Sequence, residues 1–322
     1  MPNWKKVITS GSDAALSSLN VSGDITASSY TGSFVGDGSQ LTGINTGTNL
    51  TQSVFVSPSG NNDTAIVGDL QLPFKTILSA TASANIGDTI IVYPGTYPSE
   101  SANIIKDGVN YYFYPGATVH PTASLSEYVV DIEDPTYAVN VRGAGTFISD
   151  DTSYGAIRIQ AEQCYFEFDT AKTTNNTTNT ANQGGTVNLE PTNAYSSTVN
   201  TAVDGKGIPF HVKGNIVNTG DFGTYAAALV FGRNGIYNRA DQAGYSIFIN
   251  AHVFASGSEA AVFEGRGNTN LKGTYTTGDR TNKYAISMQD GYRGTYNIDA
   301  DINGSLKLNT GEIGNSGVIC SF

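Results

Sequence analysis

Apolar and polar residues alternate along a series of short segments from residue 85 to the C-terminus. Glycine, asparagine and aspartate interrupt the pattern before a segment reaches the length of an ordinary helix, which is typical of half-buried β-strands. Such segments include residues 109–119, 127–132, 137–143, 155–160 and 164–170. The chain is therefore predicted to be all-β, with a sandwich, a barrel and a solenoid as the alternatives.

The same alternation predicts which side chains face the interior. Ile157 and Ile159 fall on one face of their strand and leave Arg158 on the other. This period also places Phe166, Phe168, Ile247 and Ile249 inside and Glu167 and Phe248 outside. An outward Phe248 is compatible with a subunit interface, although single exposed aromatic residues are ordinary.

Internal repetition favours the solenoid, because each of its turns is one structural unit. Three segments align without gaps: ALVFGRN at 228, AVFEGRG at 261 and AISMQDG at 285. KGTY at 272–275 also matches RGTY at 293–296, 21 residues further on. Repeats of variable length are typical of a β-helix, whose rungs contact only their neighbours. In this alignment Val262 and Ile286 point inward.

Residues 53–97 carry the order of elements expected at the start of such a coil. Val54–Val56 and Thr89–Tyr93 read as short strands, and residues 72–84 between them read as a helix with Leu72, Phe74, Ile77 and Leu78 on one side. A capping helix would cover backbone groups that otherwise invite edge-to-edge association. This order resembles the N-terminal cap and first rung of pectate-lyase-like β-helix proteins, common among surface polysaccharide enzymes and phage tailspikes. The resemblance implies a right-handed parallel β-helix over residues 51–322.

Residues 1–50 differ in kind from the rest of the chain. Single apolar residues are separated here by glycine, serine, threonine and aspartate, so one chain alone could not build a core. The segment GDITASSYTGSFVGDGSQLTGI resembles the N-terminal stalk repeat of phage tail fibres and related virion proteins. The resemblance implies an extended trimeric stalk that attaches to other tail or baseplate proteins. A disordered Gly/Ser-rich linker is the alternative.

Composition and charge limit the partners and the chemistry. The formal net charge of −11 argues against nucleic acid, whose phosphates would be repelled. Cys164 and Cys320 lack a paired spacing, so buried reduced thiols are expected rather than a disulfide framework or a metal site. No cofactor motif, apolar membrane span or secretory signal is recognised in the sequence. We therefore expect a virion protein, made in the host cytoplasm, without cofactor or metal.

Tyrosine and arginine gather in the C-terminal third, where aromatic faces and guanidinium groups suit the binding of sugars. Tyr275 and Tyr284 belong to this group. The repeat alignment places Arg233, Arg266 and Asp290 in one column, and the predicted glycan-binding residues are Arg233, Arg266, Asp290, Tyr292 and Arg293. Tyrosines that only suit strands or shared interfaces are the alternative.

Acidic residues cluster at two predicted turns. One cluster comprises Asp131, Glu133 and Asp134, and the other comprises Asp150 and Asp151. A calcium-assisted lyase would combine such acids with an arginine base, for which Arg142 and Arg158 are candidates. Turns account for these acids by backbone hydrogen bonding alone, so no catalytic residue is assigned.

The sequence thus predicts a homotrimeric phage tail fibre or tailspike subunit whose β-helix binds a host cell-surface glycan. One alternative is a tailspike depolymerase, either lyase or hydrolase. The other is a structural appendage of the capsid or baseplate without a receptor role. A stacked acid pair in a groove would favour the depolymerase, and a smooth surface would favour the appendage.

Overall fold

The computed structural model describes residues 53–98, 100, 104–106, 108–122, 127–133, 139–151, 154–160, 164–174, 185–189, 209–220, 227–231, 246–263, 266–279, 281, 283–288, 293–307 and 317–321. Residues 1–50, for which the sequence predicts a trimeric stalk, lie outside this set. The described residues form one short helix, α1 (Ile77–Ser83), and two β-sheets.

The larger of the two sheets has 13 described strands, and the smaller has seven. The larger contains β1 (Ser53–Val56), β2 (Thr89–Val92), β3 (Gly95–Tyr97), β4 (Asn110–Phe113), β5 (Ala117–Val119), β7 (Val139–Gly143), β8 (Thr146–Ser149), β10 (Cys164–Thr173), β12 (Pro209–Asn218), β14 (Ser246–Ala255), β16 (Arg266–Thr277), β18 (Arg293–Asn303) and β20 (Gly317–Ser321). The smaller contains β6 (Val130–Glu133), β9 (Ile157–Gln160), β11 (Gly185–Leu189), β13 (Ala227–Phe231), β15 (Glu259–Phe263), β17 (Tyr284–Met288) and β19 (Ser305–Lys307).

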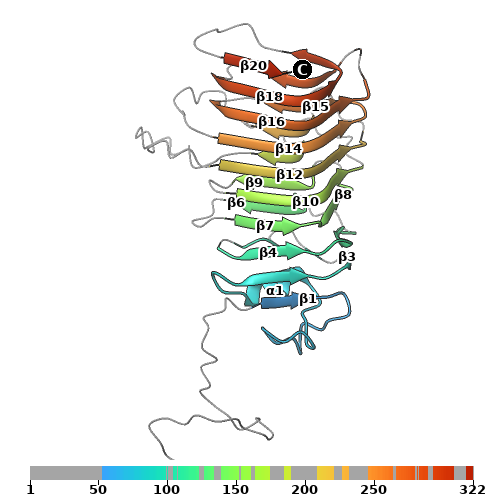
Figure 1. Cartoon of the computed structure of the whole chain (residues 1–322). Coiled ribbons are helices and arrows are strands. Elements are labelled where there is room, and N and C mark those ends of the chain that lie inside the picture. The colour runs from blue at the N-terminus through green and yellow to red at the C-terminus, as the bar shows by residue number, and fades with distance from the viewer. Residues whose placement is uncertain are drawn as a thin grey trace, which may run out of the picture. The chain divides into compact units, whose positions relative to one another are not determined.

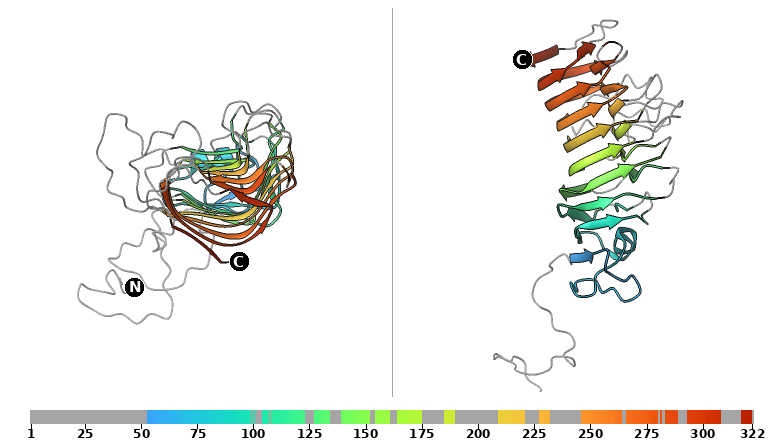
Figure 2. Two further views of the ribbon diagram at one scale, coloured as in Figure 1. Left: turned by 90° about the horizontal axis from the view of Figure 1, so that it is seen from above. Right: turned by 90° about the vertical axis from the view of Figure 1, so that its right-hand side faces the viewer.

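The strands pair in parallel with strands of the neighbouring turn. From β10 onward the chain alternates between the sheets, so that β10, β12, β14, β16 and β18 stack in one and β11, β13, β15 and β17 in the other. Figure 1 shows the rungs stacked along one axis, and Figure 2, viewed from above, shows the strands surrounding a common interior. The predicted parallel β-helix is therefore confirmed for the described part of the chain.

Apolar side chains stack in rows inside the coil. One row on the smaller sheet is Val130, Ile157, Val187, Leu229, Ala261 and Ile286, each the Cα partner of the next and each fully buried. Burial of a large aliphatic side chain contributes roughly 1.5–3 kcal/mol, so such rows supply much of the cohesion between rungs. The inward prediction is confirmed for Ile157, Ile159, Phe166, Phe168 and Ile249, and Phe248 points outward with 40 % exposure.

The predicted repeat register is wrong in both sheets. Ala261, not Val262, is the partner of both Leu229 and Ile286, so Val262 lies on the opposite face of β15 from that row, although it is buried. Lys272 pairs with Asp299, and therefore KGTY and RGTY do not occupy equivalent positions. The inward position of Ile286 is confirmed.

The long strands of the larger sheet bend where small residues stack in register. Gly214, Ala251, Gly273 and Ala300 are successive Cα partners in β12, β14, β16 and β18. Gly273 has a φ of +101°, and a Cβ atom there would lie 2.0 Å from the Ala251 carbonyl oxygen. A side chain at position 273 would collide with the backbone of the preceding rung, so this point of the row requires glycine.

Helix α1 packs against β1 and β2 at the N-terminal end of the described coil. Thr76 is its N-cap, and Ile77 and Leu78 donate their backbone N–H groups to the two carboxylate oxygens of Glu100, at 2.7 and 2.9 Å. Burial raises the pKa of Glu100 even though these hydrogen bonds act in the opposite sense. The helix is shorter than predicted because it begins only after Pro73 and Thr76.

The prediction of one apolar helix face across residues 72–78 is also wrong in part. Phe74 and Ile77 are buried, but Leu72 and Leu78 are 38 % and 37 % exposed. Leu72 precedes the helix, so helical spacing does not apply to it.

Candidate functional site

The structure brings together two of the five residues predicted to bind glycan. Arg266 begins β16 and Arg293 begins β18, and their Cα atoms are partners in neighbouring rungs. The predicted column of Arg266 with Asp290 is therefore wrong, because Arg293 is the partner of Arg266. Arg233, Asp290 and Tyr292 lie outside the described residues.

Tyr275 and Tyr284, the two tyrosines of the C-terminal third whose side chains are described, do not form an exposed cluster. Tyr275 is fully buried in the core, and burial raises the pKa of its hydroxyl. Tyr284 lies against the Lys307 ammonium, which is 5.7 Å from the ring centroid. Neither presents the open aromatic face that the sequence analysis expected of this region.

An outward row of aromatic rings instead crosses the middle of the larger sheet. Tyr165 in β10, His211 in β12 and Phe248 in β14 are successive Cα partners, and we call them the aromatic ladder. The ring centroids of Tyr165 and His211 are 6.0 Å apart, and those of His211 and Phe248 are 4.8 Å apart with the planes inclined by 7°. The parallel register thus builds a stack from residues that are distant in the sequence.

Asparagine side chains extend the same outward row on both sides of the aromatic ladder. Asn110 and Asn140 precede it, and Asn270 and Asn297 follow it. Asn140 Nδ2 donates to Asn110 Oδ1 at 3.2 Å, and Asn297 Nδ2 donates to Asn270 Oδ1 at 3.4 Å. Phe248 is therefore followed by an amide rather than by another ring, which leaves it 40 % exposed at the end of the stack.

Arg142 lies at the other end of the aromatic ladder. Its guanidinium carbon is 4.4 Å from the centroid of the Tyr165 ring, and its Nε donates to Asn140 Oδ1 at 3.0 Å. A guanidinium over an aromatic face is attracted by the ring quadrupole. The cation therefore extends the row of stacked groups.

A second group of outward rings lies on the first rungs. We call Phe55, Tyr93, Tyr112 and Tyr114 the N-terminal aromatic cluster. Tyr93 and Tyr114 are stacked with centroids 5.3 Å apart, and Tyr112 meets Tyr114 edge-on at 5.3 Å. Tyr112 is 41 % exposed and is the Cα partner of Arg142, so this cluster adjoins the aromatic ladder.

The larger sheet thus presents rigid rings beside amide donors and acceptors. The apolar C–H faces of a sugar pack on aromatic rings, while its hydroxyl groups need hydrogen-bond partners such as amides. The alternation in the sequence predicted an outward Phe248 but gave no sign of its stacking on His211. The stacking depends on which strand positions pair, and the sequence does not show this pairing because the loops between strands vary in length.

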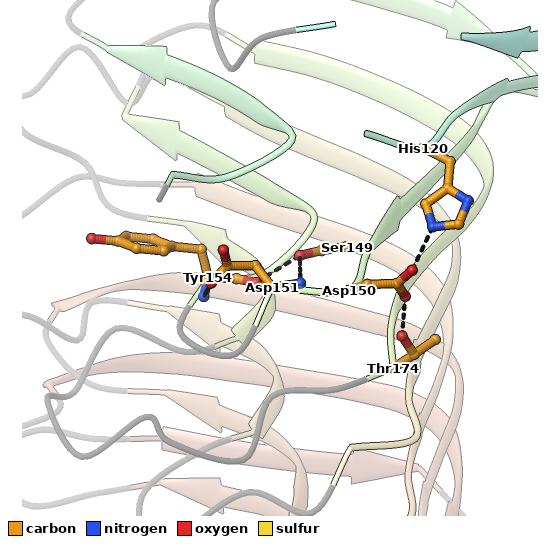
Figure 3. Close-up of polar contacts among 6 residues, drawn as sticks. All are labelled: His120, Ser149, Asp150, Asp151, Tyr154 and Thr174. Atoms are coloured by element: carbon orange, nitrogen blue, oxygen red, sulfur yellow. Dashed lines mark hydrogen bonds and ion pairs between the residues drawn. The ribbon is translucent and has the colours of Figure 1, made fainter. Parts of the chain in front are cut away.

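Three residues at one corner of the coil form a separate polar group, shown in Figure 3. His120 Nε2 lies 2.6 Å from Asp150 Oδ2, and Thr174 Oγ1 donates to Asp150 Oδ1. The Thr174 hydrogen bond, followed by the contact with His120, lowers the pKa of Asp150. They follow β5, β8 and β10, so they link three turns at the corner.

The neighbouring residues in Figure 3 satisfy the backbone of the same turn. Ser149 Oγ donates to the Tyr154 carbonyl oxygen at 2.8 Å, and Tyr154 N donates to Asp151 Oδ1 at 3.1 Å. The predicted turn role is therefore confirmed for Asp151, which accepts a backbone N–H group, whereas the printed contacts of Asp150 are with the side chains of His120 and Thr174. A hydroxyl or thiol nucleophile against His120 is not found among the described contacts of the corner.

The acid cluster at Asp131 differs from the prediction, because Asp131 lies in β6 rather than in a turn. Arg158 donates from Nε to Asp131 Oδ1 at 2.8 Å and pairs with Oδ2 through its terminal nitrogen. Both belong to the outward row of the smaller sheet, yet Asp131 is only 6 % exposed. Burial raises the pKa of Asp131, with Arg158 acting in the opposite sense. Arg158 is thus engaged in a buried ion pair and is not poised as a base.

Other features of the described residues bear on the sequence predictions. Cys164 is a free, buried thiol, as expected. No group of three histidine, cysteine, aspartate or glutamate side chains suited to a metal ion occurs in the described ranges. The one described helix, α1, has seven residues, and none of the described helical structure could span a bilayer.

Comparison of the chain with protein-family models, with curated proteins and with solved structures finds no match. The functional interpretation therefore rests on the described residues themselves. Among them, the aromatic ladder, its flanking asparagines and Arg142 combine exposure with a fixed geometry and hydrogen-bonding groups.

Proposed function

We propose that the protein is a phage tail fibre or tailspike subunit whose β-helix binds a glycan on the host cell surface. In this proposal the coil is right-handed, α1 caps its N-terminal end, and three chains associate through the stalk formed by residues 1–50. The stalk joins the other tail or baseplate proteins of the virion, and the coil carries the receptor surface.

The observation that carries the glycan proposal is the exposed end of the aromatic ladder at Phe248. One face of this ring is stacked on His211, and the next rung supplies Asn270 instead of a third large ring. A sugar ring can pack its C–H face on such an aromatic ring, and the neighbouring amide can bond sugar hydroxyls. An interface between copies of the chain would favour a less polar row than one flanked by four asparagines.

The virion context rests on the sequence of residues 1–50, which resembles a phage fibre stalk. A coil of parallel rungs is a suitable carrier for a receptor surface, because its rows of outward side chains extend along the fibre axis. The two observations are independent, so the glycan proposal does not depend on the place of the chain in the virion.

The test is incubation of the purified full chain with isolated bacterial surface polysaccharides, followed by measurement of both binding and cleavage. Equilibrium dialysis should show saturable binding, and the polysaccharide should keep its length with no new reducing ends or unsaturated sugars. Binding with cleavage would replace the proposal by the depolymerase alternative. Absence of binding to all polysaccharides would favour a structural appendage.

One observation favours the depolymerase as the second candidate. Asp299 and Asp301 lie two residues apart on the exposed face of β18, where strand geometry separates Cα atoms by about 6.6 Å. Glycoside hydrolysis uses carboxyl groups about 5–9.5 Å apart, a separation that two side chains on successive outward positions of one strand can reach. Asp299 is, however, 3.7 Å from the Lys272 ammonium. If cleavage is found, Asp299→Asn and Asp301→Asn should each abolish it while binding persists.

A further inference from the structure

The guanidinium group of Arg142 is held in place from two directions. Its Nε donates to Asn140 Oδ1 at 3.0 Å, and its central carbon lies 4.4 Å from the Tyr165 ring centroid. These contacts fix both the plane and the direction of the group. The two terminal nitrogens have no hydrogen-bond partner among the described residues, and the side chain is exposed.

Arg142 also differs from the neighbouring lysines in its ion pairing. Lys213 and Lys272 point outward from the same sheet, and they pair with Glu167 and Asp299 respectively. Within the described part of the chain no carboxylate pairs with Arg142. An oriented arginine with an open end is suited to a planar anion, because two parallel N–H groups match the two oxygens of a carboxylate.

We infer that Arg142 binds the carboxylate of an acidic sugar, so that the ligand is a polysaccharide containing uronic or sialic acid. This inference rests on the proposed glycan function and adds the chemical class of the glycan. Tyr112, the Cα partner of Arg142, is 41 % exposed and provides an aromatic surface for the adjoining sugar ring. The carboxylate and the ring would thus be bound by two neighbouring rungs.

The negative net charge of the chain makes Arg142 more important for holding an acidic ligand. An acidic polysaccharide is repelled at long range by a protein of formal net charge −11. Retention of such a ligand must come from short-range contacts, where a charged hydrogen bond exceeds the screened repulsion of distant groups. Loss of Arg142 should therefore affect binding of acidic glycans far more than loss of a paired surface lysine.

The experiment measures binding of the full chain to alginate, polygalacturonate and polysialic acid, each beside its carboxyl-reduced form. We expect at least one acidic polymer to bind, and its reduced form to bind about ten- to a hundredfold more weakly, as expected for loss of a charged hydrogen bond. Arg142→Gln should weaken binding of the acidic form by a similar factor and weaken binding of the reduced form much less. Lys213→Gln, which removes a paired lysine from the same sheet, is the matched control.

The outcomes separate this inference from the proposed function. Equal binding of acidic and reduced forms, or equal effects of Arg142→Gln and Lys213→Gln, would overturn the acidic-sugar inference. If Phe248→Ala still weakened binding in that case, the glycan function itself would stand. If no polysaccharide, acidic, reduced or neutral, were bound, both would be overturned. Circular dichroism of each variant checks that the coil is intact.

Discussion

His211 and Phe248 stack face to face across two neighbouring rungs, with ring centroids 4.8 Å apart and planes inclined by only 7°. This distance is close to the strand spacing of a sheet, about 4.8 Å, so the pairing of β12 with β14 positions the rings. Rings held in this way lose little further freedom when a ligand binds. The outer face of the coil is therefore preorganised at the point where we place the glycan.

The hydroxyl group of Tyr275 is buried without a hydrogen-bond partner among the described residues. Tyr275→Phe should therefore stabilise the fold by about 1 kcal/mol, because it removes an unsatisfied polar atom. Urea unfolding followed by circular dichroism measures the change.

The matched control is Tyr111→Phe in the same type of core position. The Tyr111 hydroxyl accepts the Lys106 backbone N–H at 2.8 Å and contacts Thr81 Oγ1 at 3.2 Å. Burial raises the pKa of this hydroxyl to about 12, with the hydrogen bonds acting against the rise. Loss of the group should destabilise the fold by about 1 kcal/mol or more. Equal effects of the two substitutions would contradict the packing described for Tyr275.

The bend of the long strands predicts that Gly273→Ala strongly destabilises the fold. The substitution combines a φ of +101° with a Cβ position 2.0 Å from the Ala251 carbonyl oxygen. A loss of at least about 2 kcal/mol is expected, since the backbone of the neighbouring rung must move. Gly68→Ala is the control, because its φ is +87° but a Cβ there has open space. A smaller loss at position 273 than at 68 would argue against the bend.

The ion pair of Asp131 with Arg158 predicts that removal of the arginine alone costs more stability than removal of both partners. Arg158→Met leaves a buried carboxylate without its main cation, and a loss of about 3–5 kcal/mol is expected. The double variant Arg158→Met with Asp131→Leu should recover most of it. Lys213→Met, which breaks an exposed pair with Glu167, should change the stability far less. Thermal unfolding of the three variants checks this order.

The contacts of Asp150 at the corner of the coil predict that the folding stability depends on pH. Its pKa is lower in the folded chain than its ordinary value of about 4. Such a carboxyl stabilises the fold above about pH 4, and the contribution is lost as pH falls through the lower folded pKa. Wild type should therefore be more stable than Asp150→Asn at pH 7, and the difference should shrink below about pH 4. A difference that stayed constant from pH 7 to pH 3 would rule out this role.

Strand positions and the inward face were predictable because they depend on a local period of two residues. Ile157 and Phe166 follow that period directly. The pairing between rungs was not predictable, because loops of unequal length separate the strands. The match of KGTY with RGTY was therefore misleading, since the real partner of Lys272 is Asp299.

The candidate site depended on this hidden register. Tyr165, His211 and Phe248 come from three rungs, and no single segment shows that they stack. The predicted site lay instead where tyrosine and arginine are frequent in the sequence. Frequency does not report exposure, as the fully buried Tyr275 demonstrates.

Retention on an immobilised polysaccharide that binds the wild-type chain tests the central claim most directly, when Phe248→Ala is compared with Phe254→Ala. Both phenylalanines lie in β14 with similar exposure, 40 % and 38 %, but only Phe248 belongs to the aromatic ladder. Phe248→Ala should weaken retention by about ten- to a hundredfold, as expected for the lost burial of a large apolar side chain, about 1.5–3 kcal/mol, with the sedimentation coefficient unchanged. Phe254→Ala should bind like the wild type. Equal retention of both variants, or a change in assembly state confined to Phe248→Ala, would contradict a glycan-binding ladder.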